Sequence, residues 1–256
     1  GENNTAQFVR ALLYKMKLIQ YNEEDAFFKS LSEMKSEEAA AVFPMKQFLN
    51  SLIGDMYWTY YQNNRYDLLE RTRVENFTLE DIKTWDATKI IEQSIQYYKN
   101  SISEPERLQQ VSLEGYNDML NNYVYDKYIP NGRKYRPALY DFLAFKAIGF
   151  FSNKEAGVTR PAEQFLLNDP IFMSDAKEFS VLDISTKDVF SFDYYAITIL
   201  RDVIRFHLND GNVDALVDAD LKRLEFVFNS SGNAEKENLY LKALQNLLDK
   251  YSVYPV

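Results

Sequence analysis

The sequence predicts an all-α protein built from stacked antiparallel helical hairpins, with no significant β-sheet. Apolar residues recur along most of the chain at the three-to-four-residue spacing of an amphipathic helix. Glycine is also scarce, because only 8 of 256 residues are glycine, whereas a typical share is ~7%. Few glycines leave few positions for hairpin turns, phosphate loops and tight strand–helix turns. This composition disfavours Rossmann, P-loop and all-β folds.

The expected helices follow from apolar stripes and from the residues that flank them. Asn22 and Thr84 have side chains that cap helix starts, and Pro44 suits a first helical turn. Asn63-Asn64 and Gly211 are expected to end helices. In chain order, helices are expected over residues 8–19, 22–34, 44–62, 84–102, 138–151, 192–208, 213–228 and 235–251.

The expected helices group into two halves around an irregular connection. Residues 1–151 form the N-terminal helical half, and its last helix is apolar on most sides, as expected of a helix covered all round. Periodicity fades over residues 152–190, which indicates a long connection with only small elements. Residues 191–256 form C-terminal hairpins. The whole is interpreted as one continuous helical module, an irregular solenoid similar to tetratricopeptide repeats but without their strict period.

Charge and composition exclude several partners. The chain carries 29 basic and 38 acidic residues, which gives 29 − 38 = −9 with His neutral. Such a chain lacks the basic surface that nucleic acids require. No apolar run approaches ~20 residues, so no membrane insertion is expected. The chain opens at Gly1 with neither an initiator methionine nor a signal peptide, so we expect an excised piece of a longer protein.

No catalytic, cofactor-binding or metal-binding residues are predicted, and the protein is not expected to be an enzyme. Cysteine is absent and His207 is the only histidine, expected half-buried near a helix end. An Asp-x-Asn-x-Asp string begins at Asp210, but Ala215 and Leu221 stand where a calcium loop needs Gly and Glu. Asp220 is expected in the first turns of a helix, where the dipole favours acids. Acidic pairs alone do not define a glycosidase site.

The aromatic run Tyr57-Trp58-Thr59-Tyr60-Tyr61 has two interpretations. It is either a surface for stacking sugars or binding proteins, or the packing between helices. Packing is favoured because the spacing matches helical burial.

Several strings together resemble the N-terminal helical region of very large Bacteroidetes alpha-2-macroglobulin-like proteins. They occur in that family's order from end to end of the chain, and they are residues 2–14, 57–65, 84–86, 136–144, 218–226 and 239–244. The residues that match family motifs and are expected to hold helices together are Trp58, Tyr61, Arg65, Trp85, Pro137, Tyr140 and Asp141. Asp141 is expected to pair with a base or cap a helix, and Arg65 to accept a buried acid.

The resemblance implies a function that the residues alone do not. Proteins of this family are large, exported and usually lipid-anchored, and they trap or inhibit proteases. The expected role of this chain is a non-catalytic scaffold or interaction module in the cell envelope, without a cofactor. Its expected partners are downstream macroglobulin domains of the same polypeptide, with proteases or envelope proteins as further candidates. The alternative is a helical carbohydrate- or peptide-binding protein of the outer-membrane nutrient-uptake type. A third hypothesis, a glycosidase, needs an open cavity with two close carboxylates.

Overall fold

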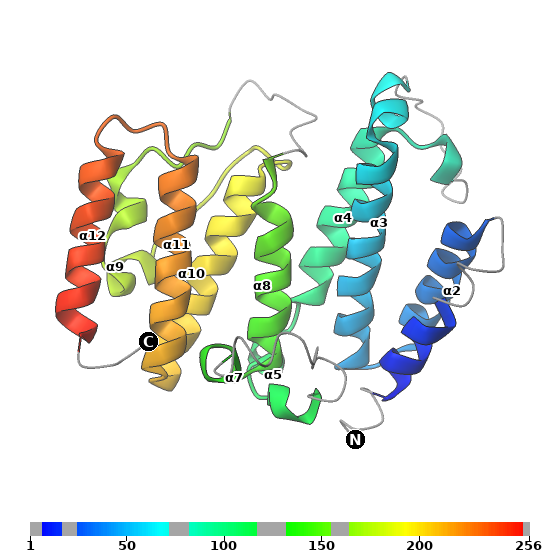
Figure 1. Ribbon diagram of the computed structural model, residues 1–256, viewed down its shortest axis with the longest axis horizontal. Coiled ribbons are helices and arrows are strands. Elements are labelled where there is room, and N and C mark those ends of the chain that lie inside the picture. The colour runs from blue at the N-terminus through cyan, green and yellow to red at the C-terminus, as the bar shows by residue number, and fades with distance from the viewer. Residues whose placement is uncertain (1–6, 17–24, 72–81, 117–131, 155–163, 253–256) are drawn as a thin grey trace. The chain divides into compact units, whose positions relative to one another are not determined.

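The computed structural model describes residues 7–16, 25–71, 82–116, 132–154 and 164–252. These residues form α-helices and short 3-10 helices and contain no β-strand, so the predicted all-α class is confirmed (Figure 1). The chain divides into two compact units, Gly1–Tyr128 and Ile129–Val256. Within the described ranges, no helix is both long and apolar enough to cross a lipid bilayer.

The first unit is organised around a long helix, α3. Residues 7–16 are helical, and the elements that follow are α2 (Ala26–Ala40), α3 (Met45–Glu70), η1 (Ile82–Thr84), α4 (Ala87–Ser101), α5 (Pro105–Leu108) and η2 (Leu113–Tyr116). Helix α3 packs against both α2 and α4, as the blue to cyan ribbons show (Figure 1). Helix α3 is therefore the helix that both α2 and α4 contact.

Aromatic side chains fill the contact between α3 and α4. The ring of Tyr57 lies roughly parallel to that of Trp85, with 6.0 Å between centroids, and stacks on Tyr97 at 5.7 Å. Gly54 lets the Tyr98 ring approach the α3 backbone, because a β-carbon at position 54 would lie only 3.0 Å from that ring. Both Tyr57 and Trp85 are buried. Of the predicted aromatic run, Tyr57, Trp58 and Tyr61 are thus buried in the core, whereas Tyr60 is half-buried.

The helical geometry of α3 breaks at Asn64, where the sequence predicts a helix end. Asn64 departs from helical geometry (φ −120°, ψ 17°), so the span Met45–Glu70 joins two helical segments across a kink. The Asn64 side-chain amide donates to the Tyr60 carbonyl oxygen at 2.8 Å. The predicted end of the first segment at Asn63-Asn64 is therefore confirmed. The second segment, which the buried side chain of Leu68 anchors, was not predicted.

One local prediction in the first unit, the cap at the start of α4, was wrong. Thr84 does not cap it, because Thr84 is the last residue of η1. The cap is Asp86, whose carboxylate accepts the Lys89 backbone N–H at 2.8 Å. Asp86 thereby satisfies one of the backbone donors that have no partner within the helix.

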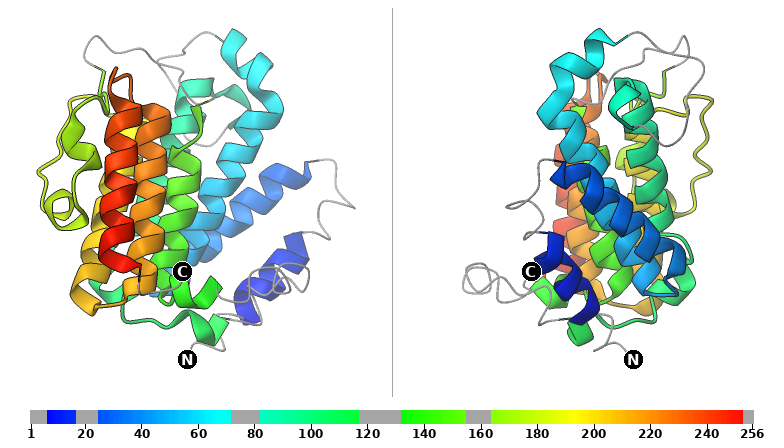
Figure 2. Two further views of the ribbon diagram at one scale, coloured as in Figure 1. Left: turned by 60° about the vertical axis from the view of Figure 1, so that its left-hand side comes forward. Right: turned by 90° about the vertical axis from the view of Figure 1, so that its right-hand side faces the viewer.

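The second unit is a row of long helices with short helical elements packed against them. Its elements are α7 (Gly132–Tyr135), α8 (Leu139–Phe151), η4 (Pro170–Met173), α9 (Ala176–Ser180), α10 (Phe192–Asp210), α11 (Val213–Ser230) and α12 (Lys236–Tyr251). Helix α10 packs against α8, α9 and α11, and α11 packs against α12. The green, yellow, orange and red helices lie side by side in this order of contact (Figure 1 and Figure 2).

Helix α8 is buried along most of its length and joins the apolar core of the second unit. Phe150 and Phe151 pack against Phe192 of α10 with ring centroids 4.9 and 5.4 Å apart, and Phe151 also packs against Tyr195 at 4.9 Å. These rings join the end of α8 to the start of α10. The predicted stop at Gly211 is confirmed, because this residue has φ +74° and lies directly after α10.

The irregular segment 164–191 is fixed to the helices by arginine side chains. Carbonyl oxygens outside a regular helix need other donors, and α10 and α11 provide them. Arg201 donates to Leu182, Arg205 to Ser180, and Arg223 to Phe172 and Ser174, at 2.6 to 3.1 Å. The connection predicted over residues 152–190 thus lies inside the second unit, whereas the compact units divide between Tyr128 and Ile129.

The helix α12 is the least buried long helix of the second unit. Only Ala243 and Leu247 of α12 are buried. Tyr240 stacks on Phe228 of α11 with 4.7 Å between ring centroids. Contacts between successive helices agree with hairpins, and the finer prediction of an irregular solenoid stays a prediction.

Candidate functional site

The residues of the predicted structural motifs are divided between the two units. Trp58 and Tyr61 lie on α3 in the first unit, where their rings stack with 5.2 Å between centroids, and both are buried. Trp85, in the same unit, stacks on Tyr57 instead. Tyr140 is buried on α8 in the second unit. These residues therefore serve separate helix contacts.

Of the three remaining motif residues, Arg65 and Pro137 are more exposed than the aromatic ones, and only Asp141 is buried. Arg65 and Pro137 are half-buried, and Pro137 directly precedes Ala138, the residue before α8. No carboxylate of the described residues forms an ion pair with Arg65, so its expected buried acid is not found there. Asp141 is completely buried and fulfils both of its expected roles, as described below.

An apolar groove of about 450 Å³ lies in the first unit. We call it the α2–α3 groove, and the side chains that line it include Met16, Phe27, Met34, Leu52, Asp55, Met56 and Thr59. The α3 members are spaced by three and four residues, so they form one stripe along that helix. The opposite wall comes from α2 and from the helix over residues 7–16. The volume is within the range of ligand pockets, about 300–1,000 Å³.

Asp55 is the one charged side chain among the described residues that line the α2–α3 groove. Its carboxylate accepts a hydrogen bond from the Tyr98 hydroxyl of α4. Burial of the phenol and the adjacent Asp55 charge both raise the pKa of Tyr98, so this hydroxyl remains a donor. The Tyr98 bond fixes the carboxylate on the side of the groove formed by α3.

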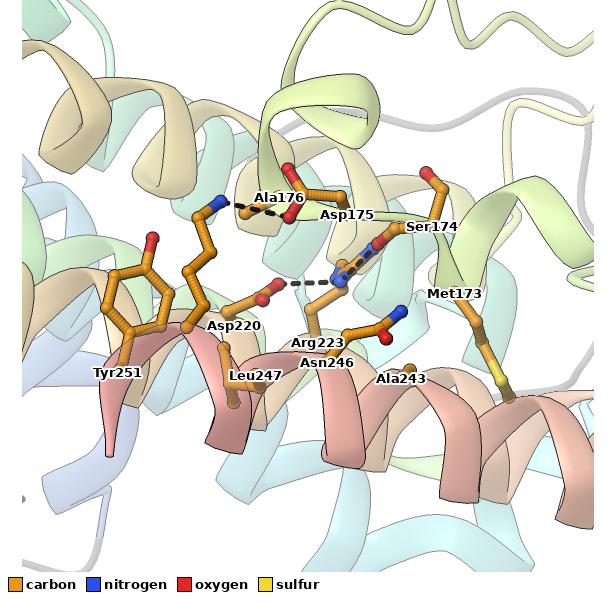
Figure 3. Close-up of a pocket in the computed structure, with 11 residues that line it drawn as sticks. Met173, Ser174, Asp175, Ala176, Asp220, Arg223, Ala243, Asn246, Leu247 and Tyr251 are labelled. Atoms are coloured by element: carbon orange, nitrogen blue, oxygen red, sulfur yellow. Dashed lines mark hydrogen bonds and ion pairs between the residues drawn. The ribbon is translucent and has the colours of Figure 1, made fainter. Parts of the chain in front are cut away.

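A second candidate site is a small polar cavity between η4, α9, α11 and α12 (Figure 3). At its centre the Arg223 guanidinium lies 2.7 Å from the Asp220 carboxylate and 4.5 Å from the Phe179 ring centroid. Arg223 and Asp220 are only 1% and 3% exposed. Toward the surface, Lys250 of α12 pairs with Asp175 at 3.0 Å. The cluster therefore ties three separate segments together through charge.

This polar cavity is too small for an organic substrate. Its volume is about 20 Å³, which is close to the space that one water molecule needs. The Nε of Arg223 and the Oγ of Ser174 are buried there without a hydrogen-bond partner. Asp220 Oδ1 is near Arg223 but accepts no well-aligned hydrogen bond, so that close contact is mainly Coulombic. Asp175 and Asp220 thus share a cavity that cannot admit a sugar ring.

Burial dominates the electrostatics of the central pair. It raises the pKa of Asp220, an effect that Arg223 only partly offsets. It also lowers the pKa of Arg223, although Asp220 opposes this change. Burial alone would raise the pKa of Asp175, but the Lys250 ammonium and the Lys177 backbone N–H together hold it below its usual value. Burial of the central pair thus carries a desolvation cost that the attraction between Asp220 and Arg223 only partly offsets.

His207 lies between two carboxylates in the second unit. Its Nε2 is 3.0 Å from Asp141 of α8, and its Nδ1 is 3.0 Å from Asp210 at the end of its own helix. The ring is 1% exposed, so the expectation of a half-buried residue was wrong. Asp141 also accepts the Ala138 backbone N–H at 2.9 Å. It therefore both caps α8 and pairs with the histidine.

The protonated form of His207 is favoured. Burial lowers its pKa, but the hydrogen bonds and charges of Asp141 and Asp210 outweigh burial and raise the pKa above its ordinary value. A closed Asp–His–Asp group of this kind joins α8 to α10. Its carboxylate Asp141 and its ring are both shielded from solvent.

Neither polar group offers a site for metal chemistry. Among the described residues, no three His, Cys, Asp or Glu side chains are grouped so that they could hold a metal ion. Comparisons of the chain with protein-family models, with curated proteins and with solved structures give no match. The resemblance to alpha-2-macroglobulin-like proteins therefore stays a prediction.

Sequence reasoning missed the buried pair on α11. Asp220 was expected only as an acid that favours the first turns of a helix, but it is buried beside Arg223. The available signal was that Leu216, Asp220, Arg223 and Val227 follow one helical stripe, in which the outer two are apolar. No local pattern predicts the pairing of Asp141 with His207, because 66 residues separate them.

Proposed function

We propose that this chain is a non-catalytic helical interaction module of a large alpha-2-macroglobulin-like protein of the cell envelope. One observation carries the proposal: the aromatic residues of the motifs on which the resemblance rests are helix contacts in the core. Trp58, Tyr61, Trp85 and Tyr140 are each at most 9% exposed. Motifs that a family retains for scaffolding would have this property, whereas motifs of a reaction centre would face a cleft.

The arrangement of the helices supports the scaffold role. Successive helices pack on one another, as α3 does with α4 and α10 with both α8 and α11. We infer that they form an irregular solenoid of antiparallel hairpins, which offers long side surfaces for other domains. The proposed partners are downstream macroglobulin domains of the same polypeptide, together with proteases or other envelope proteins. No cofactor is part of this role.

The carbohydrate-binding alternative has less support. Sugar-stacking sites present an aromatic face to solvent, but Trp58 is 9% exposed and Trp85 is 1% exposed. A glycan array, together with titration of tryptophan fluorescence, tests this alternative. Saturable quenching by one glycan would favour it over the scaffold role.

The gene on both sides of this segment provides the direct test of the proposal. We expect an export signal upstream and a β-rich macroglobulin region downstream of residue 256. Deleting residues 1–256 from the parent protein should leave protease trapping by that downstream region intact, and should abolish cross-links between the module and its envelope partners. A gene without any macroglobulin region, or turnover of peptide or glycoside substrates by the isolated chain, would contradict the proposal.

A further inference from the structure

Both ring nitrogens of His207, the one histidine of the chain, face carboxylates. Nε2 lies 3.0 Å from Asp141 Oδ1, and Nδ1 lies 3.0 Å from Asp210 Oδ2. An ionised carboxylate only accepts hydrogen bonds, whereas a neutral imidazole has one N–H and one lone pair. Only the protonated ring can therefore donate to both carboxylates. A neutral ring must direct its lone pair at one of them.

The two carboxylates differ in what they lose when the ring becomes neutral. Asp141 is 0% exposed, so a carboxylate that loses its histidine donor there cannot replace it with water. The Asp210 side chain is 30% exposed at the end of α10, so its carboxylate can turn to solvent. Loss of a donor costs more free energy for a buried charge than for one that water can reach. We therefore expect the neutral ring to keep its proton on Nε2, toward Asp141, and to lose its bond to Asp210.

Asp210 also holds the turn between α10 and α11. Its Oδ1 accepts the Asn212 backbone N–H at 2.8 Å, while Oδ2 faces His207. Gly211 lies between them with φ +74°, and the Asn212 side chain caps α11 by accepting the Ala215 backbone N–H at 3.1 Å. The two oxygens of Asp210 belong to one planar group. A carboxylate that turns away from the ring therefore also withdraws the acceptor of the Asn212 N–H.

The titratable groups that face the ring come from α8 and from α10 itself, namely Asp141 and Asp210. On α11, Asp214 and Asp218 form ion pairs with basic side chains near α7 instead. The charged side chains of α9 are exposed, whereas the ring is buried. Burial lowers the pKa of His207, but the two carboxylates outweigh burial and raise it. The ring is thus protonated in acid and loses its proton as the pH rises through this raised value.

We propose that Asp141, His207 and Asp210 form a pH-sensitive switch on the turn between α10 and α11, in which loss of the His207 proton releases Asp210 and leaves Asp141 bonded. The turn is held in acid and loosens as the pH rises. The switch does not depend on the scaffold role proposed above, so either can fail without the other.

Nitrogen-15 NMR of the full chain tests the direction of the switch, because the chain has only one imidazole to observe. Spectra recorded from pH 5 to pH 10 follow both ring nitrogens. We expect two protonated nitrogens in acid, a midpoint above the ordinary value of about 6.5, and a neutral ring with its proton on Nε2. A neutral ring with its proton on Nδ1, or a midpoint below the ordinary value, would overturn the proposal.

Backbone hydrogen exchange tests the release of the turn. Protection factors, which correct for the intrinsic pH dependence of exchange, are compared one pH unit below and one above the midpoint of the ring. Protection of the Asn212 amide should fall about tenfold, as expected for one lost hydrogen bond to a charged acceptor. The Ala138 amide, which donates to Asp141 at 2.9 Å, should keep its protection. Unchanged protection at Asn212, or an equal fall at Ala138, would contradict the switch.

Two variants with equally exposed side chains connect the effect to one carboxylate. Asp210→Asn removes the charge, and its amide can donate to the lone pair of a neutral ring, so the ring midpoint should fall and Asn212 should lose its pH-dependent change in protection. Asp218→Asn is the matched control, because Asp218 is also 30% exposed but pairs with Arg136, and it should behave like the parent. A full pH response in Asp210→Asn, or its loss in Asp218→Asn, would refute the role of Asp210.

Discussion

Replacing Arg223 by methionine removes the central charge of the polar cavity while keeping an unbranched side chain of similar reach. Arg223 is 1% exposed and donates to the carbonyl oxygens of Phe172 and Ser174 at 3.1 and 2.8 Å. It also lies 2.7 Å from the Asp220 carboxylate. The variant therefore leaves two buried carbonyl groups without these donors and one buried carboxylate without its counter-charge.

The expected loss of stability follows from this uncompensated charge. Removing one partner of a buried ion pair destabilises a protein by about 3–5 kcal/mol, which is a large part of a typical stability of about 5–15 kcal/mol. In Arg223→Met the pKa of Asp220, already raised by burial, should rise further. An acid with a raised folded-state pKa contributes stability below its unfolded pKa of about 3.9, and this contribution is lost as the pH rises through the folded value. The deficit of the variant should thus be largest at neutral pH and shrink in acid.

Urea unfolding followed by far-ultraviolet circular dichroism measures this deficit at pH 7 and at pH 5. With a slope of about 2 kcal/mol per molar urea, the midpoint should fall by about 2 M at pH 7. Lys222→Met is the matched control, since Lys222 lies next to Arg223 on α11 with an exposed side chain, and it should change stability by less than about 1 kcal/mol. Adding Asp220→Asn to Arg223→Met should recover about half of the loss. A single-variant loss below about 1 kcal/mol, or a double variant no more stable than the single, would refute the reasoning.

Three further predictions concern packing, capping and pH. Gly54→Ala should destabilise the protein by about 1–2 kcal/mol in urea unfolding, because the new β-carbon would lie 3.0 Å from the Tyr98 ring. Gly149→Ala should instead stabilise the protein by about 0.5–1 kcal/mol, because no atom lies within 4 Å of its new β-carbon. Equal effects of the two variants would contradict the packing argument. Asp86→Ala should lower stability by about 1 kcal/mol through loss of the α4 cap, and a neutral result would refute that role. The carboxylates around His207 raise its pKa although burial opposes them. The stabilising contribution of His207 is therefore present below its unfolded pKa of about 6.5 and is lost as the pH rises through the folded value. The free energy of unfolding of the parent should fall across this pH window, and that of His207→Gln should not show this pH dependence.

Much of the helical content could be predicted because long amphipathic stripes encode it directly. The boundaries of α10, α11 and α12 lie close to the expected ranges, and Gly211 ends α10 as expected. The kink of α3 at Asn64 lies where two consecutive asparagines predict a stop. The helical segment beyond the kink could not be predicted in the same way, because the burial of Leu68 holds it in place. The burial that decides this outcome depends on residues far from it in sequence.

The candidate sites were less predictable because each joins residues from different elements. The α2–α3 groove needs three helices to be placed before its lining exists, although the spacing of Leu52, Asp55, Met56 and Thr59 on one stripe is visible in the sequence. The Asp220–Arg223 pair is local, but its burial depends on η4, α9 and α12, which cover it. Periodicity can assign a residue to a helix face, whereas it cannot identify the segment that lies against that face.

Arginine side chains of the second unit replace the regular backbone hydrogen bonds that a long irregular segment lacks. Residues 164–191 contain only short helices, so many of their carbonyl oxygens need donors from elsewhere. Guanidinium groups from α10 and α11 reach these oxygens with several donors each, which a lysine could not do with the same geometry. Arg223 is buried beside a carboxylate, so its contacts fix the position of the segment at Phe172 and Ser174. The segment and the helices are therefore specified together, and α12, whose Lys250 holds Asp175, closes the same cluster from the other side.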